Sequence, residues 1–81
     1  MSAAKNNPPH GFSLSFSRHK RSWGWKDQYP DANAAYDRER FGFLSRREAN
    51  ADAHAEAGLR ARAKAGLVRF EATTKTWHAS A

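Results

Sequence analysis

The chain has 81 residues, enough for one small domain, and much of its 40% hydrophobic content is alanine, which buries little surface. It has no cysteine, which excludes a disulfide framework and thiolate metal sites and fits a reducing compartment. Fourteen lysines and arginines against eight acidic residues give a formal charge of +6, which favours a polyanionic partner; a soluble protein that is merely basic is the alternative.

The first nine residues show no periodicity and end in two prolines, which predicts a disordered tail over 1–9 and a single domain over 10–81. The segment 12–17 then alternates apolar and polar residues, as a half-buried strand does. Its two phenylalanines and its leucine are expected to face the core. Its three serines are expected to face outward, where their hydroxyls can donate hydrogen bonds to phosphates.

A basic cluster, Arg18-His19-Lys20-Arg21, occupies the position of a hairpin turn. Residues 22–26 are predicted as the returning strand, with Trp23 and Trp25 on one face. At least one tryptophan is expected in the core, and a half-exposed second one would offer a platform for a sugar or a base. Gly24 indicates a bulge or a close backbone approach.

Residues 27–37 contain Pro30 and several turn formers, and they are predicted as a loop that Tyr29 and Tyr36 anchor to the domain. The loop holds three aspartates, but their spacing matches no calcium-binding pattern. Acidic residues in a polar loop are usually solvated, so we assign them no site.

The third strand is predicted over 38–43. Regular alternation places Arg38 and Arg40 on the side of the serines and of the lysine that ends the second strand. Phe41 and Phe43, two residues apart, are expected on the opposite side, where a helix would cover them. The sequence therefore predicts that positive side chains gather on the exposed side of the sheet.

A helix is predicted over 46–65, because Ser45 and Glu48 have the spacing of a capping box and alanine has high helix propensity. Charged residues recur every four positions from Glu48 to Lys64, and this stripe is expected to be solvated. Gly66 is expected just beyond the helix end, in the left-handed conformation.

The buried side of this helix is predicted to be the small and apolar one, with a second alanine stripe as a close competitor. The preferred face comprises Ala51, Ala55, Gly58, Leu59 and Ala65, and the competing stripe comprises Ala49, Ala53 and Ala57.

The segment 67–78 is rich in β-branched and aromatic residues; it predicts a last strand and allows a second short one. The expected fold is thus α+β: a three- to four-stranded antiparallel sheet packed on one face by a single long helix, in the order β-β-β-α-β. The sequence shows no nucleophile with a matched base, no phosphate-cradling glycine loop and no metal-ligand spacing among its four histidines. We therefore expect no enzymatic activity, no metal and no cofactor.

Three short strands, a basic first turn and the junction Phe41-Gly42-Phe43-Leu44-Ser45-Arg46-Arg47-Glu48-Ala49 form a recognisable order over residues 11–65. This order resembles the arm-site DNA-binding domain of phage tyrosine recombinases and the related plant ethylene-response-factor domain. In that family the sheet enters the major groove and the helix packs behind it. The resemblance implies a DNA interface made of Arg18, Lys20, Arg21, Trp23, Lys26, Arg38 and Arg40. The chain departs from the family in its long loop over 27–37, its strand-like C-terminal segment and the absence of a following catalytic domain.

Two functions fit these observations. The first is a small, phage-borne DNA-binding module that docks the exposed face of its sheet on duplex DNA. The alternative is a phage-encoded inhibitor, similar to anti-CRISPR proteins, that binds a host protein or nucleoprotein complex. No apolar run approaches the roughly 20 residues of a membrane span, so we expect no membrane partner and a soluble, cytoplasmic protein of a bacterial host. An open sheet edge would allow a homodimer as well as a monomer.

Overall fold

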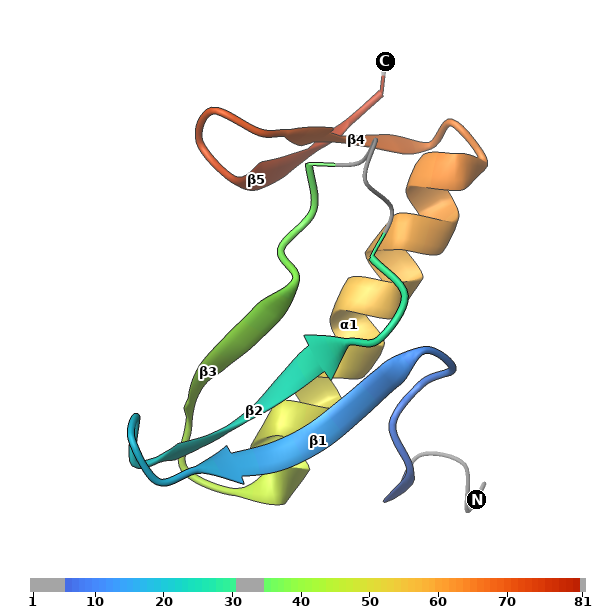
Figure 1. Cartoon of the computed structure of the whole chain (residues 1–81). Coiled ribbons are helices and arrows are strands. Elements are labelled where there is room, and N and C mark those ends of the chain that lie inside the picture. The colour runs from blue at the N-terminus through green and yellow to red at the C-terminus, as the bar shows by residue number, and fades with distance from the viewer. Residues whose placement is uncertain (1–5, 31–34, 81) are drawn as a thin grey trace.

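The computed structural model describes residues 6–30 and 35–80. A three-stranded antiparallel sheet has the order β1-β2-β3 and consists of β1 (Phe12–Ser17), β2 (Ser22–Asp27) and β3 (Glu39–Phe43). Helix α1 (Arg46–Lys64) covers one face of this sheet, and β4 (Val68–Glu71) and β5 (Thr76–Ala79) form a second sheet beyond its C-terminal end (Figure 1). The predicted α+β class and element order are confirmed. The C-terminal strands form a hairpin of their own and do not join the first sheet.

The core lies between β1, β2 and α1. Trp25 is fully buried, and its ring meets the edge of Phe12 at a centroid distance of 5.1 Å. Ala53 completes the buried cluster from the helix side, and Leu14 and Phe43 pack against it. This is a small core, as expected for a chain whose apolar content is largely alanine.

The β2–β3 pairing contains an irregularity that the sequence reading missed. Trp23 lies opposite Phe43, but Gly24 lies opposite Phe41, so the register shifts by one residue between them. The extra residue is Gly42, whose φ of 114° is in the range that favours glycine. A Cβ on Gly24 would overlap the Phe41 ring, which agrees with the close backbone approach predicted there.

The shift at Gly42 inverts the predicted phase of β3. Residues that lie directly opposite one another share a face, so Phe43 joins Trp23 on the helix side, and Phe41 points to the other side. Arg40 lies opposite Trp25 and therefore faces the helix. The predictions that the two phenylalanines share a side and that Arg40 points outward are wrong.

Helix α1 begins and ends as its capping residues predict. The Ser45 hydroxyl accepts a hydrogen bond from the Glu48 amide at 3.2 Å. At the other end, Gly66 has a φ of 82°, and its amide donates to the carbonyl of Ala63 while the next amide, of Leu67, donates to Arg62. This paired arrangement satisfies two of the carbonyls that a helix end leaves free.

The buried face of α1 is the competing alanine stripe and not the preferred one. Ala49 and Ala53 are fully buried, whereas Ala51 and Ala55 are exposed. The ends of the charged stripe, Glu48 and Lys64, are exposed as expected, but its middle members, Asp52, Glu56 and Arg60, flank the buried alanines and face the sheet. Its central member, Glu56, is only 2% exposed. The helix therefore brings charge, as well as methyl groups, to the sheet.

The structure describes two of the connecting segments in part, the segment before β1 and the loop between β2 and β3. Residues 1–5 of the predicted tail lie outside the described residues, but the carbonyls of Asn6 and Asn7 accept hydrogen bonds from Arg46 and His54 of α1. The expected anchor Tyr29 is 74% exposed, whereas Tyr36 does anchor the loop, through its contacts with the hairpin and with Arg60. Residues 31–34 of that loop lie outside the described residues.

The C-terminal hairpin is held by its own aromatic cluster. Tyr36 stacks on Trp77 at 5.4 Å and meets the edge of Phe70 at 5.6 Å, and the two hairpin rings are 5.0 Å apart.

Across the described part of the chain, no helix is long and apolar enough to cross a membrane.

Candidate nucleic-acid interface

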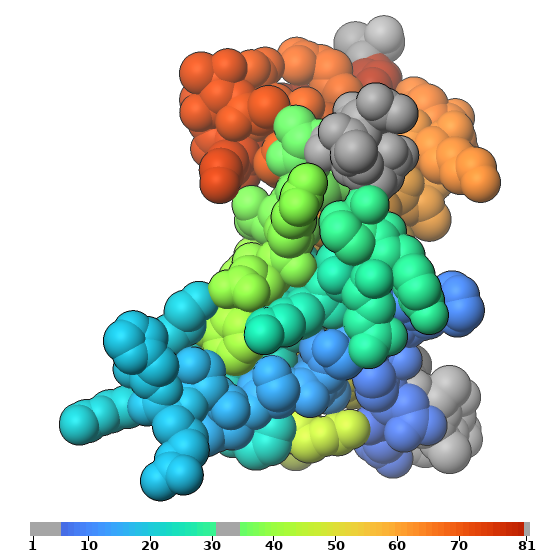
Figure 2. Space-filling view, in the orientation of Figure 1, coloured from blue at the N-terminus to red at the C-terminus, as the bar shows by residue number. Residues whose placement is uncertain are grey.

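The face of the three-stranded sheet that α1 leaves uncovered is called the outer face, and the face toward the helix is the inner face. Strand pairing assigns eight residues to the outer face, most of them small or hydroxyl-bearing: Ser13, Ser15, Ser17, Ser22, Gly24, Lys26, Glu39 and Phe41. Figure 2 looks onto this face, with β1 and β2 in front and most of the helix hidden behind them. The predicted outward orientation of the serines and of Lys26 is confirmed.

The basic turn, Arg18-His19-Lys20-Arg21, connects β1 to β2 and extends beyond the end of the helix (Figure 1). All four of its residues are exposed. The Ser17 hydroxyl accepts a hydrogen bond from the Lys20 amide at 3.1 Å. Arg21 has a φ of 52°, a left-handed conformation that glycine or asparagine adopts more readily. The turn therefore presents its cations to solvent from an ordered backbone.

Lys20 reaches back over the outer face. Its ammonium group pairs with Glu39 at 2.8 Å and lies 4.7 Å from the centre of the Phe41 ring. The hydrogen bond from Lys20, assisted by the charges of Lys20 and Lys26, lowers the pKa of Glu39. Such exposed pairs contribute little to stability. Lys20 can therefore exchange this carboxylate for another anion at small cost.

Lys26 and Arg38 complete the exposed cations of this region. Neither side chain has an ion-pair partner within 4 Å among the residues that the structure describes. Trp23, by contrast, lies on the inner face and is half-buried, because it shares a side with Trp25. Of the seven predicted interface residues, five are thus exposed, and Trp23 and Arg40 face the helix side.

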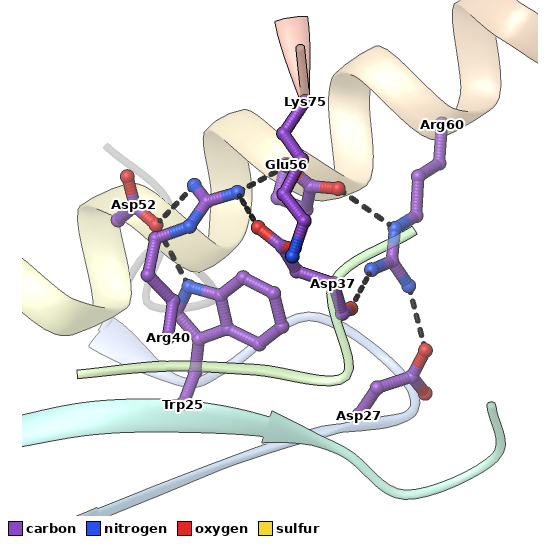
Figure 3. A network of polar contacts seen from close by, with 8 residues as sticks. All are labelled: Trp25, Asp27, Asp37, Arg40, Asp52, Glu56, Arg60 and Lys75. Atoms are coloured by element: carbon purple, nitrogen blue, oxygen red, sulfur yellow. Dashed lines mark hydrogen bonds and ion pairs between the residues drawn. The ribbon is translucent and has the colours of Figure 1, made fainter. Parts of the chain in front are cut away.

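Arg40 belongs to a set of polar contacts between sheet and helix that we call the inner network, drawn in Figure 3. Its guanidinium donates to Asp52 and to Asp37, each at 2.9 Å, and to Glu56 at 3.3 Å. Asp52 also accepts a hydrogen bond from the Trp25 indole at 2.7 Å. The buried indole N–H of Trp25 is therefore satisfied by a helix carboxylate, as buried polar groups require.

Arg60 is the second cation of the inner network. Its guanidinium donates to Glu56 at 3.0 Å, to Asp27 at 2.6 Å and to the backbone carbonyl of Asp37 at 2.7 Å. It also lies over the ring of Tyr36 at 4.8 Å. Arg60 thereby joins the helix to β2 and to the loop before β3.

The inner network shifts the pKa values of Asp37 and Arg40 in the direction that favours their charged forms. The hydrogen bond from Arg40 lowers the pKa of Asp37, against the opposing effect of burial, and Lys75 at 3.5 Å adds to it. For Arg40, burial disfavours the charged form, but the carboxylates of Asp37, Asp52 and Glu56 outweigh burial and raise its pKa. Both groups are therefore charged at neutral pH.

The inner network also changes the charge that the surface presents. It uses four carboxylates, from Asp27, Asp37, Asp52 and Glu56, against two arginines and, at its edge, Lys75. The side chains of these four acidic residues are mostly turned away from solvent. On the outer face, Glu39 is the single acidic side chain among the described residues, and Lys20 already pairs with it. The outer face and the basic turn are consequently more positive than the composition suggests.

Sequence reasoning missed the inner network, although one signal for it was present. Asp52, Glu56 and Arg60 recur every four residues on the same side as the buried alanines, so they had to approach the sheet if that stripe was the buried one. The described residues hold no group of three or more histidine or acidic side chains placed to bind a metal ion.

Comparisons with known proteins do not assign this chain to a family. No protein-family model matches the chain, and searches of curated proteins and of solved structures find no match either. The resemblance to arm-site DNA-binding domains therefore stays a prediction, and function is argued from the site itself.

Proposed function

We propose that the protein is a small DNA-binding module that docks its outer face and basic turn on duplex DNA. The observation that carries the proposal is the separation of charge across the sheet. Four carboxylates are held on the inner side by Arg40 and Arg60, whereas the cations of the outer side and the turn are exposed. An exposed face on which cations outnumber acidic side chains is the electrostatic footprint of a polyanion-binding protein.

The chemistry of the outer face suits a phosphate backbone. Lysine and arginine side chains neutralise phosphates and release counterions, and serine hydroxyls donate hydrogen bonds to phosphate oxygens. Ser13, Ser15 and Gly24 carry little bulk, so a duplex can approach the sheet closely over the middle of β1 and β2. The proposed contacts are Arg18, Lys20, Arg21, Lys26 and Arg38; Arg40 is excluded because it is committed to the inner network.

The test is the salt dependence of binding to a fluorescently labelled duplex, measured by anisotropy. The double variant Arg18→Ala with Arg21→Gly removes two cations of the basic turn, and glycine suits the backbone conformation at position 21. We expect weaker binding and a log–log salt slope reduced by about two, because each lost phosphate contact contributes about 0.9 to the slope.

The matched control is Arg62→Gln with Lys64→Gln, which removes the same charge from the exposed last turn of α1, at the other end of the helix. This control is expected to retain the wild-type slope. Salt-independent or absent binding by the wild-type protein would contradict the proposal. Equal losses in the two double variants would also contradict it, because they would assign binding to overall charge and not to this surface.

A further inference from the structure

Two aromatic side chains on the inner face extend beyond the core. Phe16 is 50% exposed, and Trp23, directly opposite it on β2, is half-buried. Their rings meet edge to face, with centroids 5.8 Å apart. Neither residue belongs to the buried cluster around Trp25. We call this pair the aromatic platform.

The aromatic platform adjoins the basic turn at both ends. Phe16 precedes Arg18 by two residues, and Trp23 follows Arg21 by two. Both arginines are exposed, and neither has an ion-pair partner within 4 Å among the described residues. An apolar surface bordered by free cations repels a second copy of itself, so a symmetric dimer through this patch is disfavoured. The aromatic platform and its neighbouring arginines are instead complementary to a ligand that carries both flat rings and negative charge.

We propose that the aromatic platform binds an unpaired nucleotide, whose base stacks on the face of one ring and contacts the other ring at its edge, while the flanking phosphates lie on Arg18 and Arg21. Every base has a π face, so such stacking tolerates any sequence. This inference rests on the proposed DNA-binding function, because the two sites share the basic turn. A strand that leaves the end of a duplex on the outer face passes around this turn and reaches the platform. The preferred ligand is therefore a duplex with a single-stranded extension.

The backbone conformation of the basic turn also supports a ligand site at Arg21. Arg21 holds a left-handed conformation, which is unfavourable for a residue with a Cβ. Among the described residues, the other non-glycine residue in this conformation is Lys75, which pairs with Asp37. Arg21 has no such partner among the described residues, so its side chain is available to a ligand. An observed outlier of this kind is a reason to infer function at that position.

The experiment compares three ligands: a short blunt duplex, the same duplex carrying a thymidine extension of about six nucleotides, and a free single strand of thymidines. The extension is within the site size of single-strand binders. For the wild-type protein we expect the extension to raise affinity by about fivefold or more, the contribution of one stacked base. Phe16→Leu keeps an apolar side chain but removes the ring, and it should lose most of this gain. Tyr29→Leu, at an exposed aromatic outside the platform, should keep it.

Tryptophan fluorescence provides an independent readout. Stacking on Trp23 should quench emission when the extended duplex binds, and Trp23→Phe should abolish the quenching while a ring remains for the base. The other two tryptophans are the buried Trp25 and the hairpin residue Trp77, which already stacks on Tyr36. Circular dichroism of each variant verifies that it folds.

The possible outcomes separate this inference from the proposed function. Binding to both duplexes with equal affinity would overturn the aromatic platform as a nucleotide site and leave duplex docking intact. Binding to the extended duplex and to free single strands, but not to the blunt duplex, would support the platform and contradict docking of the outer face. Absence of binding to all three would overturn both proposals.

Discussion

Arg40 and Lys26 lie on neighbouring strands of the sheet but on opposite faces, and their surroundings differ completely. Arg40 on the inner face contacts three carboxylates, whereas Lys26 on the outer face is exposed and has no ion-pair partner among the described residues. On the inner face, charged side chains form ion pairs that hold the sheet and the helix together. On the outer face, the Lys26 cation is exposed to solvent.

The difference follows from solvent access. Between sheet and helix, water is partly excluded, so an arginine that loses its carboxylates, or a carboxylate that loses its arginine, stays unsolvated. On the outer face, water replaces any lost partner. The same substitution, a cation to alanine, should therefore affect folding on one face and binding on the other.

The sharpest test of this contrast is Arg60→Ala. Arg60 is 16% exposed and holds Glu56, Asp27 and a backbone carbonyl of the loop, so its loss leaves Glu56 buried beside one weak partner. We expect a loss of about 3–5 kcal/mol in the free energy of unfolding, as when one partner of a buried ion pair is removed. Urea denaturation measures this loss. Arg62→Ala, on the exposed side of the same helix, should change stability by no more than about 0.5 kcal/mol.

The second test compares Arg40→Ala with Arg38→Ala, two arginines of the same segment that face different surroundings. The Arg40 side chain is 35% exposed, so we expect a smaller loss than for Arg60, about 2 kcal/mol, because solvent screens part of the interaction. Arg38→Ala should leave the urea midpoint nearly unchanged and weaken DNA binding. Equal stability of the two variants would contradict the inward orientation of Arg40.

The third test addresses the bulge that orients β3. Gly42→Ala places a Cβ at a φ of 114°, and we expect a loss of about 1–2 kcal/mol from the strained backbone. Gly58→Ala is the matched control, because Gly58 lies in the helix and a methyl group added there would meet only open space. It should raise stability by up to about 1 kcal/mol through its helix propensity. Thermal unfolding of the two variants should therefore shift in opposite directions.

The smallest expected effect is the pH dependence of stability. The pKa of Asp37 is lowered in the folded protein by its hydrogen bond with Arg40. Its contribution is therefore complete above the ordinary aspartate value of 3.8 and is lost as the pH falls through the folded-state value. Urea midpoints measured from pH 6 downward should decline in this acidic range. Arg40→Ala should show a shallower decline, and an unchanged slope would remove Asp37 from the network.

Short-range sequence patterns were sufficient to predict most of the secondary structure. Alternation located β1, the spacing of Ser45 and Glu48 located the start of α1, and Gly66 located its end. The basic turn and the outward serines were also predicted correctly. Each of these features depends on residues within a few positions of one another, so each can be read from the chain itself.

The candidate site was predicted less completely, and for one local reason. A single extra residue in a strand moves every side chain beyond it to the other face. Gly42 is that residue in β3, so Arg40 and Phe41 exchanged the sides that strict alternation assigns to them. The five exposed cations and the shared face of Trp23 and Trp25 were predicted from the sequence, whereas the inward orientation of Arg40 was not.

The amino-acid sequence by itself determined the elements of this protein, their order and its net positive charge, because propensity, capping and composition do not depend on the tertiary structure. Only the tertiary structure decided which charges became internal. Arg60 and Asp27, 33 residues apart, meet because the helix crosses the sheet in one particular orientation. Two nearly equivalent alanine stripes on α1 allowed more than one orientation, and the contacts of the carboxylates with Trp25, Arg40 and Arg60 distinguish the one that the protein adopts.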